Sequence, residues 1–291
     1  MATVRYVKLE RGLVSVTGAD RQTFLQGLIS QDVDRISANH AAYGALLTPQ
    51  GKYLHDFCLA EIDDHLILDS EKGRTDELIS RMTRFKLRAE VKLECVDDFT
   101  VIAVFSPDAP AALDLAANPG AARPLGGGIA FVDPRSAELG CRLLLPTTDA
   151  PAVLASLPTS EAKFEDYDAL RIRLGIPDGV RDMDVDKSTL LECNFESLNG
   201  IDWGKGCYIG QEITARTKYR GLIKHQLVPV SVGAEAPSPG TAILAGDQKV
   251  GEIRSILDGF AIALLRLDAL EKAQNGHSLT AAGASILPLS T

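Results

Sequence analysis

The sequence has 291 residues, of which 45% are hydrophobic, and it carries a formal net charge of −9. This length allows two or three domains of ordinary size, and the composition is that of a globular chain with a sizeable core. The acidic balance excludes a protein that coats duplex DNA, because such binding needs an extended basic surface.

The cysteines indicate neither a disulfide framework nor a zinc site, because they are dispersed, odd in number and without a C-x-x-C pair. They also lack the close spacing of iron–sulfur cluster ligands. We therefore expect no stable metal in the isolated chain and a reducing compartment. The five cysteines are Cys58, Cys95, Cys141, Cys193 and Cys207.

The apolar runs are shorter than a membrane span, and the first residues enter a strand pattern without an apolar signal core. From these features we expect a bacterial cytoplasmic protein. We also expect a monomer, with neither DNA nor a membrane among its partners.

In chain order, the first half of the sequence predicts short strands and helices. Residues 4–17 indicate a hairpin that turns at Glu10-Arg11-Gly12, and a helix follows Asp20, a candidate N-cap. Short connections favour antiparallel pairing, and the mixture of elements indicates an α+β fold. The elements expected next are strands at 40–48, 53–62 and 65–69, a helix at 74–86, strands at 90–96 and 99–105, a helix at 109–117 and a loop at 118–128.

The second half begins with strands and then gives the clearest predicted helix, at residues 161–174. Its apolar side chains share one face, and Gly175 stands where a helix commonly ends. Residues 178–200 are irregular, and their alternating aspartates lack the glycine and the glutamate of a calcium loop. From residue 224 onward, short apolar runs separated by Gly and Pro turns predict a small β-barrel.

The segment Lys205–Glu212, K-G-C-Y-I-G-Q-E, is the most unusual stretch of the sequence. Two glycines flank Cys207 closely enough to allow a ligand to approach, and Lys205 favours the thiolate. A predicted helix after Gly210 would also favour negative charge near its N-terminus. We therefore expect Cys207 to have a pKa below that of free cysteine. A structural reading stays open, because a lone cysteine is most often a small buried apolar residue.

The same segment, followed by A-R-T-K-Y-R-G at residues 215–221, resembles the signature of the YgfZ family. Residues 18–28, 49–57 and 169–177 resemble further segments of that family. YgfZ proteins are folate-binding-type proteins of iron–sulfur cluster assembly and repair, with a mitochondrial branch. They are related in fold to the T-protein of the glycine cleavage system, a tetrahydrofolate-dependent aminomethyltransferase.

The resemblance implies an α+β fold of the T-protein type, in which three domains form a ring that ends in a small β-barrel. We expect residues 1–48 and 131–223 to form a first α+β domain. Residues 49–130 would form a second α+β domain, and residues 224–291 the barrel.

The resemblance also implies a folate-binding accessory protein for the [4Fe–4S] clusters of client enzymes. Its partners would be iron–sulfur assembly proteins and those clients, and its cofactor would be tetrahydrofolate or a derivative in a central cavity. Cys207 would be the reactive or cluster-contacting thiol, with Lys205 beside it. The implied folate-binding residues are Asp56, Asn194, Tyr208, Gln211, Glu212, Arg216, Lys218 and Arg220.

Two rival functions stay open, a folate-dependent one-carbon or aminomethyl transferase (including a tRNA-modification factor) and a plain scaffold. If the chain is an enzyme, we expect a tetrahydrofolate-dependent transferase. Two departures from T-protein speak against the aminomethyltransferase. His55-Asp56 stands where T-protein has adjacent aspartates, and Arg173-Leu174 stands where T-protein has a glutamate soon after an arginine.

Overall fold

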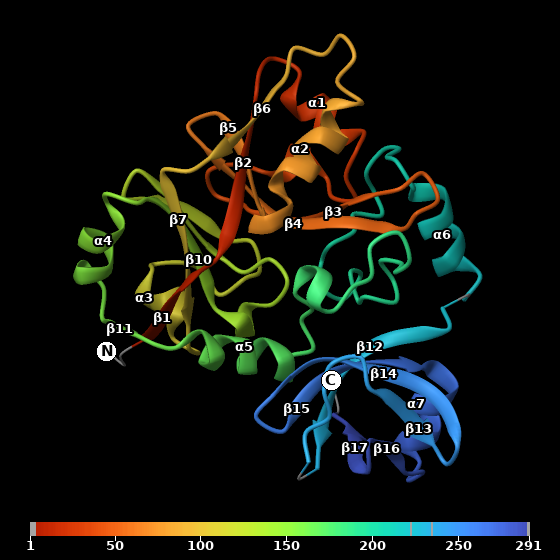
Figure 1. The fold of residues 1–291 in the computed structure, drawn as a ribbon. Coiled ribbons are helices and arrows are strands. Elements are labelled where there is room, and N and C mark those ends of the chain that lie inside the picture. The colour runs from red at the N-terminus through yellow and green to blue at the C-terminus, as the bar shows by residue number, and fades with distance from the viewer. Residues whose placement is uncertain (1–3, 222, 234, 290–291) are drawn as a thin grey trace.

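Two β-sheets and a closed barrel form the framework of the structure, a computed structural model that describes residues 4–221, 223–233 and 235–289 (Figure 1). The first sheet has six strands in the order β11-β1-β7-β10-β9-β8, with β1 and β11 parallel and the other neighbours antiparallel. Its strands are β1 (Val4–Leu9), β7 (Phe99–Phe105), β8 (Ala122–Leu125), β9 (Gly128–Val132), β10 (Cys141–Pro146) and β11 (Thr159–Glu161).

The second sheet is antiparallel and has five strands in the order β3-β4-β5-β2-β6. The meander predicted for residues 40–69 is confirmed, because β3, β4 and β5 are neighbours in sequence order. The strands of this sheet are β2 (Arg11–Thr17), β3 (Ala42–Leu47), β4 (Tyr53–Ile62), β5 (His65–Glu71) and β6 (Lys92–Val96).

The chain passes from the first sheet to the second at Glu10, between β1 and β2, so the predicted hairpin is wrong. Strand β1 pairs with β7 and β11, and β2 pairs with β5 and β6. Each strand thereby gains neighbours on both edges, which an isolated hairpin would not provide. Gly12 permits the close approach of α2 at this crossing, because a Cβ there would lie 2.3 Å from Thr75 Cγ2.

The sheets cross both domain boundaries predicted within residues 1–223. Strands β3 and β4 pair across residue 48, and β7 pairs with β10 across residue 130. Each sheet therefore contains strands from both predicted domains. The division of residues 1–223 into two domains stays a prediction.

Short helices cover the outer faces of the two sheets. Helices α1 and α2 pack on the second sheet, and α3 and α4 pack on the first. Helix α3 is shorter than predicted because Asp114, at φ 51°, lies outside the helical region, and the expected loop 118–128 contains β8. The helices before the barrel are α1 (Arg21–Gln26), α2 (Thr75–Thr83), α3 (Ala109–Ala112), α4 (Ala150–Ser156), α5 (Phe164–Arg173) and α6 (Gln211–Tyr219). The 3₁₀ helices are η1 (Val33–Arg35), η2 (Lys72–Arg74), η3 (Ala137–Leu139) and η4 (Gly179–Arg181).

A central core joins the inner faces of both sheets. Tyr43 from the second sheet stacks on Phe195 with ring centroids 4.9 Å apart, and Phe105 from the first sheet meets Tyr167 of α5 edge to face at 5.6 Å. Leu227 from the barrel belongs to the same core. The irregular segment that precedes α6 thus forms part of the protein interior.

The C-terminal barrel is closed, and the prediction of a small barrel from residue 224 is confirmed. Its strands follow each other in the order β12-β15-β14-β13-β16-β17, and α7 (Leu267–Gln274) packs against it. None of the helices in the described part of the chain is long and apolar enough to cross a membrane. The barrel strands are β12 (His225–Val232), β13 (Ala242–Ala245), β14 (Gln248–Leu257), β15 (Phe260–Arg266), β16 (Leu279–Ala281) and β17 (Ala284–Pro288).

Candidate functional site

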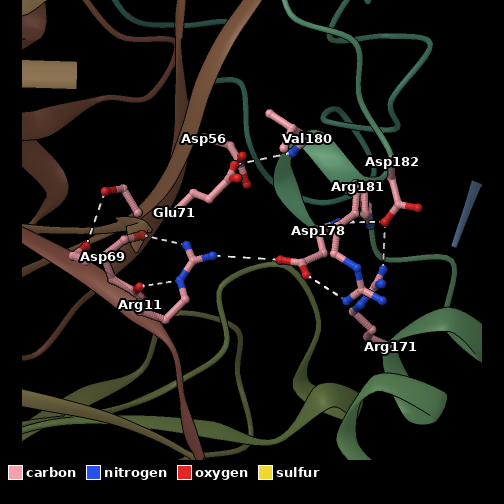
Figure 2. Close-up of polar contacts among 12 residues, drawn as sticks. Arg11, Asp56, Asp69, Glu71, Arg171, Asp178, Val180, Arg181 and Asp182 are labelled. Atoms are coloured by element: carbon pink, nitrogen blue, oxygen red, sulfur yellow. Dashed lines mark hydrogen bonds and ion pairs between the residues drawn. The ribbon is translucent and has the colours of Figure 1, made fainter. Parts of the chain in front are cut away.

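A cavity of about 450 Å³ lies where β1 passes into β2, beside α5 and η4. Most of its lining is charged, and Leu9, Phe164 and Tyr167 contribute apolar surface. Figure 2 shows part of its wall, where side chains from β2, β5 and the α5–η4 region point toward one another. The charged lining residues are Lys8, Glu10, Arg11, Glu71, Arg135, Arg142, Arg171, Asp178 and Arg181.

A buried row of alternating charges forms one side of the cavity. Arg11 Nε donates to Asp69 Oδ1 at 2.7 Å, and Arg142 pairs with the other oxygen of Asp69. Arg142 Nε also donates to Asp133 Oδ2 at 3.1 Å, and Arg135 Nη2 donates to the same atom at 2.8 Å. Burial alone would raise the pKa of both aspartates, but the arginines outweigh it and hold each pKa below its ordinary value. Three cations and two carboxylates leave this row with an excess positive charge.

The adjoining part of the cavity wall is built around Asp178. Arg181 Nη1 donates to Asp178 Oδ2 at 3.0 Å, and Arg11 Nη1 lies 3.8 Å from Asp178 Oδ1 (Figure 2). Burial would raise the pKa of Asp178, but Arg171, Arg11 and Arg181 outweigh it and lower that pKa to about 2. Arg181 also donates to Asp168 Oδ2 at 2.8 Å, which fixes η4 against α5.

Arg171 connects this wall to the barrel. Its Nη1 donates to Asp182 Oδ2 at 2.8 Å, and its Nη2 donates to Ser255 Oγ of β14 at 2.8 Å. The Ser255 backbone N–H donates to Asp182 Oδ1 at 2.9 Å, and Arg171 Nε donates to Asp168 Oδ1 at 2.6 Å. Arg171 is thus a structural link, and its guanidinium is already engaged on every nitrogen.

Glu71, like Glu10, is a lining carboxylate that has no arginine ion pair among the residues the structure describes. Its Oε2 accepts a long hydrogen bond of 3.4 Å from the Val180 N–H (Figure 2), and burial raises its pKa. Gly179 passes beside it at φ 48°, and a Cβ there would lie 2.7 Å from Glu71 Oε2. Because glycine has no Cβ, residue 179 can pass this close to the Glu71 carboxylate without a steric clash.

Asp56, implied by the resemblance as a folate contact, lies behind this wall. It is buried, and its carboxylate accepts hydrogen bonds from the Tyr43 hydroxyl at 3.0 Å and the Tyr53 hydroxyl at 2.7 Å. Burial, and then the carboxylate, raise the pKa of both tyrosines well above the ordinary value, so both hydroxyls remain donors. Asp56 is not among the described residues that line the cavity.

His55 faces away from Asp56, because successive side chains on β4 point to opposite faces of the sheet. Its Nε2 lies 3.8 Å from Glu77 of α2. Burial, followed by the charge of Arg74, lowers the pKa of His55 to about 3, so the imidazole is neutral near pH 7. The residue that replaces one of the two T-protein aspartates therefore points toward α2 and away from the central core.

Lys205 anchors the cysteine segment. Its Nζ is buried and donates to the carbonyl oxygens of Ile29, at 2.8 Å, and Gln31, at 2.6 Å. Burial lowers the pKa of Lys205 to about 8. Cys207 itself is exposed, and Gly206 beside it has open space around it. The lysine thus holds the loop in place through backbone carbonyls.

Gly210 packs the motif onto the turn between β3 and β4. It adopts φ 83° just before α6, and a Cβ there would lie 2.6 Å from the Thr48 carbonyl oxygen. Across the contact, a Cβ on Gly51 would lie 3.0 Å from the Gly210 carbonyl oxygen. Two of the segments that carry the family resemblance therefore meet through their glycines.

The remaining residues predicted to bind folate lie on or beside α6 and next to the barrel. Asn194 Nδ2 donates to the Leu227 carbonyl oxygen at 2.6 Å, and Arg216 pairs with Glu212 at 2.8 Å. Arg220 is exposed at the end of α6. Among the described residues, the lining of the first cavity includes none of Asn194, Tyr208, Gln211, Glu212, Arg216, Lys218 and Arg220.

A second cavity, of about 490 Å³, lies nearer to the cysteine segment and is lined in part by Asp202, Trp203 and Glu196. Asp202 Oδ1 accepts hydrogen bonds from the backbone N–H groups that lead into the motif, including that of Lys205 at 3.0 Å. Lys218 pairs with Glu196 and lies 4.0 Å from the Trp203 ring centroid. The basic end of α6 thus borders this cavity.

Sequence reasoning missed the charged lining of the first cavity. The available signal was the presence of charges inside apolar strands, as with Asp69 in β5 and Arg142 in β10. Within the described ranges, no three His, Cys, Asp or Glu side chains are grouped so that they could hold a metal ion. The expectation that the isolated chain holds no stable metal stays a prediction.

The fold defines the class of protein. The crystal structure of the glycine cleavage system aminomethyltransferase T from Bartonella henselae matches this chain with a TM-score of 0.81. The match covers 100% of this chain and 86% of that one, at 16% sequence identity. The chain therefore has the aminomethyltransferase T fold, as expected, with a closed barrel at its C-terminus.

Sequence relatives then give the family. Residues 224–290 match the family model of the CAF17 C-terminal beta-barrel domain. The chain is 32% identical to the human "Iron-sulfur cluster assembly factor IBA57, mitochondrial" over 275 residues, covering 88% of this chain and 75% of the human protein. The mouse protein of the same name is 31% identical, with 90% and 77% covered. The chain belongs to the IBA57 family of iron–sulfur cluster assembly factors, and the YgfZ resemblance is the coarser statement of this relationship.

These relatives also correct the expected location. The IBA57 homolog of Neosartorya fischeri is 31% identical over 80% of this chain, which spans 59% of that longer protein, and it too is named mitochondrial. The expectation of a bacterial cytoplasmic protein is contradicted, because the relatives that give the family are named as mitochondrial proteins of eukaryotes. Their names do not support tRNA modification either.

Proposed function

We propose that the protein acts in iron–sulfur cluster assembly and binds a reduced folate in the cavity at the β1–β2 crossing. The observation that carries the assembly role is the 32% identity to a human protein named for that role, over 88% of this chain. The partners would be iron–sulfur assembly proteins and client [4Fe–4S] enzymes.

The side chains of the first cavity fit a tetrahydrofolate-type ligand. Its volume of about 450 Å³ lies in the range of small-molecule sites. Leu9 and Tyr167 would contact the rings, and Glu71 would accept hydrogen bonds from the pterin amino and ring N–H groups. Arg181, half-exposed at the cavity, would meet a glutamyl carboxylate, because a guanidinium bonds carboxylates bidentately. Asp56 would support this wall through Tyr43.

Cys207 is the proposed functional thiol, in contact with a cluster or with a partner protein. Its support is its exposure on a segment that Lys205 and Gly210 fix in place. In cells lacking the endogenous assembly factor, we expect the wild-type chain to restore [4Fe–4S] enzyme activity and Cys207→Ala not to restore it. Cys95→Ala, at the other exposed cysteine, is the matched control and should restore activity fully. Full rescue by Cys207→Ala would make the motif structural and favour the scaffold.

Calorimetry with tetrahydrofolate tests the cavity separately. We expect Glu71→Gln to weaken binding at least about tenfold, since a neutral amide offers a weaker acceptor to the pterin N–H groups. Glu77→Gln, on α2 beside His55, should bind as the wild type does. No binding by the wild-type chain would refute the folate proposal and leave the assembly role standing.

Apart from the shared fold, no observation favours the aminomethyltransferase rival. His55 faces α2, and the guanidinium of Arg173 lies 4.6 Å from the ring centroid of Phe260 in the barrel. Neither His55 nor Arg173 therefore supplies the cavity with the carboxylate that T-protein has at the corresponding position. We expect the purified chain to have no glycine-cleavage activity.

A further inference from the structure

The turn between α2 and β6 combines exposed apolar and basic side chains. Residues 84–88 read Arg-Phe-Lys-Leu-Arg, and residues 78–89 contain cations but no Asp or Glu, on a chain whose net charge is −9. Arg81 is paired with Glu77 at 2.7 Å. The three cations of the turn itself form no ion pair with the residues that the structure describes.

The turn presents its apolar side chains to solvent in a fixed conformation. Leu87 is 91% exposed and Phe85 is 43% exposed. Leu87 adopts φ 44°, a left-handed conformation that disfavours a side chain of this size. Hydrogen bonds hold it there, from Lys86 N to Thr83 O at 3.1 Å and from Ala89 N to Lys86 O at 2.7 Å. Leu87 is therefore both strained in its backbone and exposed to solvent, within a turn that hydrogen bonds keep ordered.

Both ends of the turn are anchored in the protein. Met82 and Val91 are buried in the core between α2 and the second sheet. Figure 1 shows the connection from α2 to β6 at the end of the molecule opposite the barrel. The turn thus projects at one end of the molecule, where it can contact a flat surface.

We propose that this turn, residues 84–88, docks the protein onto an anionic lipid surface. Its two apolar side chains would enter the headgroup region, and its three cations would contact lipid phosphates. The inference goes beyond the assembly role, because it concerns where the protein acts and uses no residue of the candidate site.

Size and charge favour a lipid surface over an acidic partner protein. A stable protein interface buries roughly 800 Å² on each side, which is more than a five-residue turn supplies. A bilayer needs only a few inserted side chains and adjacent cations. The acidic remainder of the chain would be repelled and would orient the turn toward the membrane. The sequence-based expectation of no membrane partner rested on the search for spans, which a peripheral contact does not need.

Flotation of the full chain with phosphatidylcholine vesicles, with and without cardiolipin, tests the proposal. We expect binding to the cardiolipin-containing vesicles alone, weakening as salt is raised. Phe85→Ser combined with Leu87→Ser should reduce binding at least about tenfold. Arg84→Gln combined with Arg88→Gln should reduce it roughly 25-fold, since each cation near the surface contributes about fivefold.

Matched controls lie on the barrel. Leu287 is 60% exposed, so Leu287→Ser removes an exposed leucine elsewhere, and Lys249→Gln with Lys272→Gln removes two cations elsewhere. Both controls should bind vesicles as the wild type does. Equal loss in the controls, equal binding to neutral vesicles, or no binding by the wild type would overturn the proposal. Binding to polyglutamate but not to cardiolipin vesicles would also overturn it, in favour of an acidic protein partner.

Discussion

Exposure separates the cysteines into two groups. Cys58, Cys141 and Cys193 are buried, and burial raises the pKa of all three thiols, to about 12 for Cys58 and Cys141. Cys95 and Cys207 are exposed. Burial, opposed by a hydrogen bond and reinforced by nearby aspartates, leaves the pKa of Cys95 above its ordinary value. The sequence does not distinguish Cys95 from the buried group.

Alkylation at neutral pH should therefore modify Cys207 first. A raised pKa keeps Cys95 in its thiol form, and the buried cysteines are also inaccessible. Iodoacetamide labelling followed by peptide mass spectrometry measures each rate. Cys95→Ser should leave the fast phase unchanged, and Cys207→Ser should remove it. Labelling of Cys95 ahead of Cys207 would contradict the reactive-thiol assignment.

Leu87 offers a second test at the scale of one residue. Leu87→Gly removes the left-handed strain at φ 44° and should raise the free energy of unfolding by about 0.5–1 kcal/mol. The same variant should lose vesicle binding, because the inserted side chain is gone. Urea unfolding measures the first effect. Leu287→Gly, in strand β17, should instead destabilise by a similar amount; equal effects at both sites would argue against strain at Leu87.

At the scale of elements, the sequence predicts what local patterns determine. The helix α5 and its C-terminal Gly175, at φ 67°, follow from periodicity and glycine chemistry, and the barrel follows from its spaced turns. Long-range pairing does not follow from such patterns, so the local pattern of residues 4–17 predicts one hairpin although β1 and β2 lie in different sheets. The charged row was missed for the same reason: Asp69, Asp133 and Arg142 lie on separate segments that meet only in the fold. The cysteine segment was recognised, while its contact with the turn at Gly51 needed the structure.

Strand β4 gives a matched pair of substitutions on opposite faces of one sheet. Asp56→Asn should weaken tetrahydrofolate binding several-fold, because the carboxylate orders Tyr43 and Tyr53 behind Glu71. His55→Asp, which recreates the T-protein pair, should change that affinity less than about twofold, since position 55 faces α2. Calorimetry measures both variants. Equal weakening by the two would mean that the cavity depends on the whole strand.

At the scale of the molecule, several polar links join the barrel to the two-sheet body, and Arg254 of β14, which pairs with Asp184 at 2.7 Å, forms one of them. Arg171 of α5 bonds to Ser255 of β14, and Asn194 bonds to β12 through the Leu227 carbonyl oxygen. Asn194, implied as a folate contact, has its amide engaged in this way, and Gln226 Nε2 donates to its Oδ1 at 2.9 Å. The link through Arg171 continues into the charge network of the cavity through Asp168 and Asp182. The attachment of the barrel and the position of the cavity wall therefore both depend on the carboxylates of Asp168 and Asp182.

This network predicts how stability depends on pH. The folded-state pKa of Asp178, about 2, lies below the ordinary value of 3.8, and those of Asp69 and Asp133 are lowered as well. The unfolded chain therefore takes up protons first as pH falls. The stability that these carboxylates contribute is complete above about pH 4 and is lost progressively as pH falls toward 2.

Asp178→Asn should lower the free energy of unfolding by about 1–2 kcal/mol at pH 7 and make the decline in stability below pH 4 shallower. Urea unfolding at a series of pH values measures both effects, and Asp64→Asn, in the exposed β4–β5 turn at φ 62°, is the control that should match the wild type. An unchanged decline in Asp178→Asn would show that the arginines around the cavity do not stabilise its carboxylate.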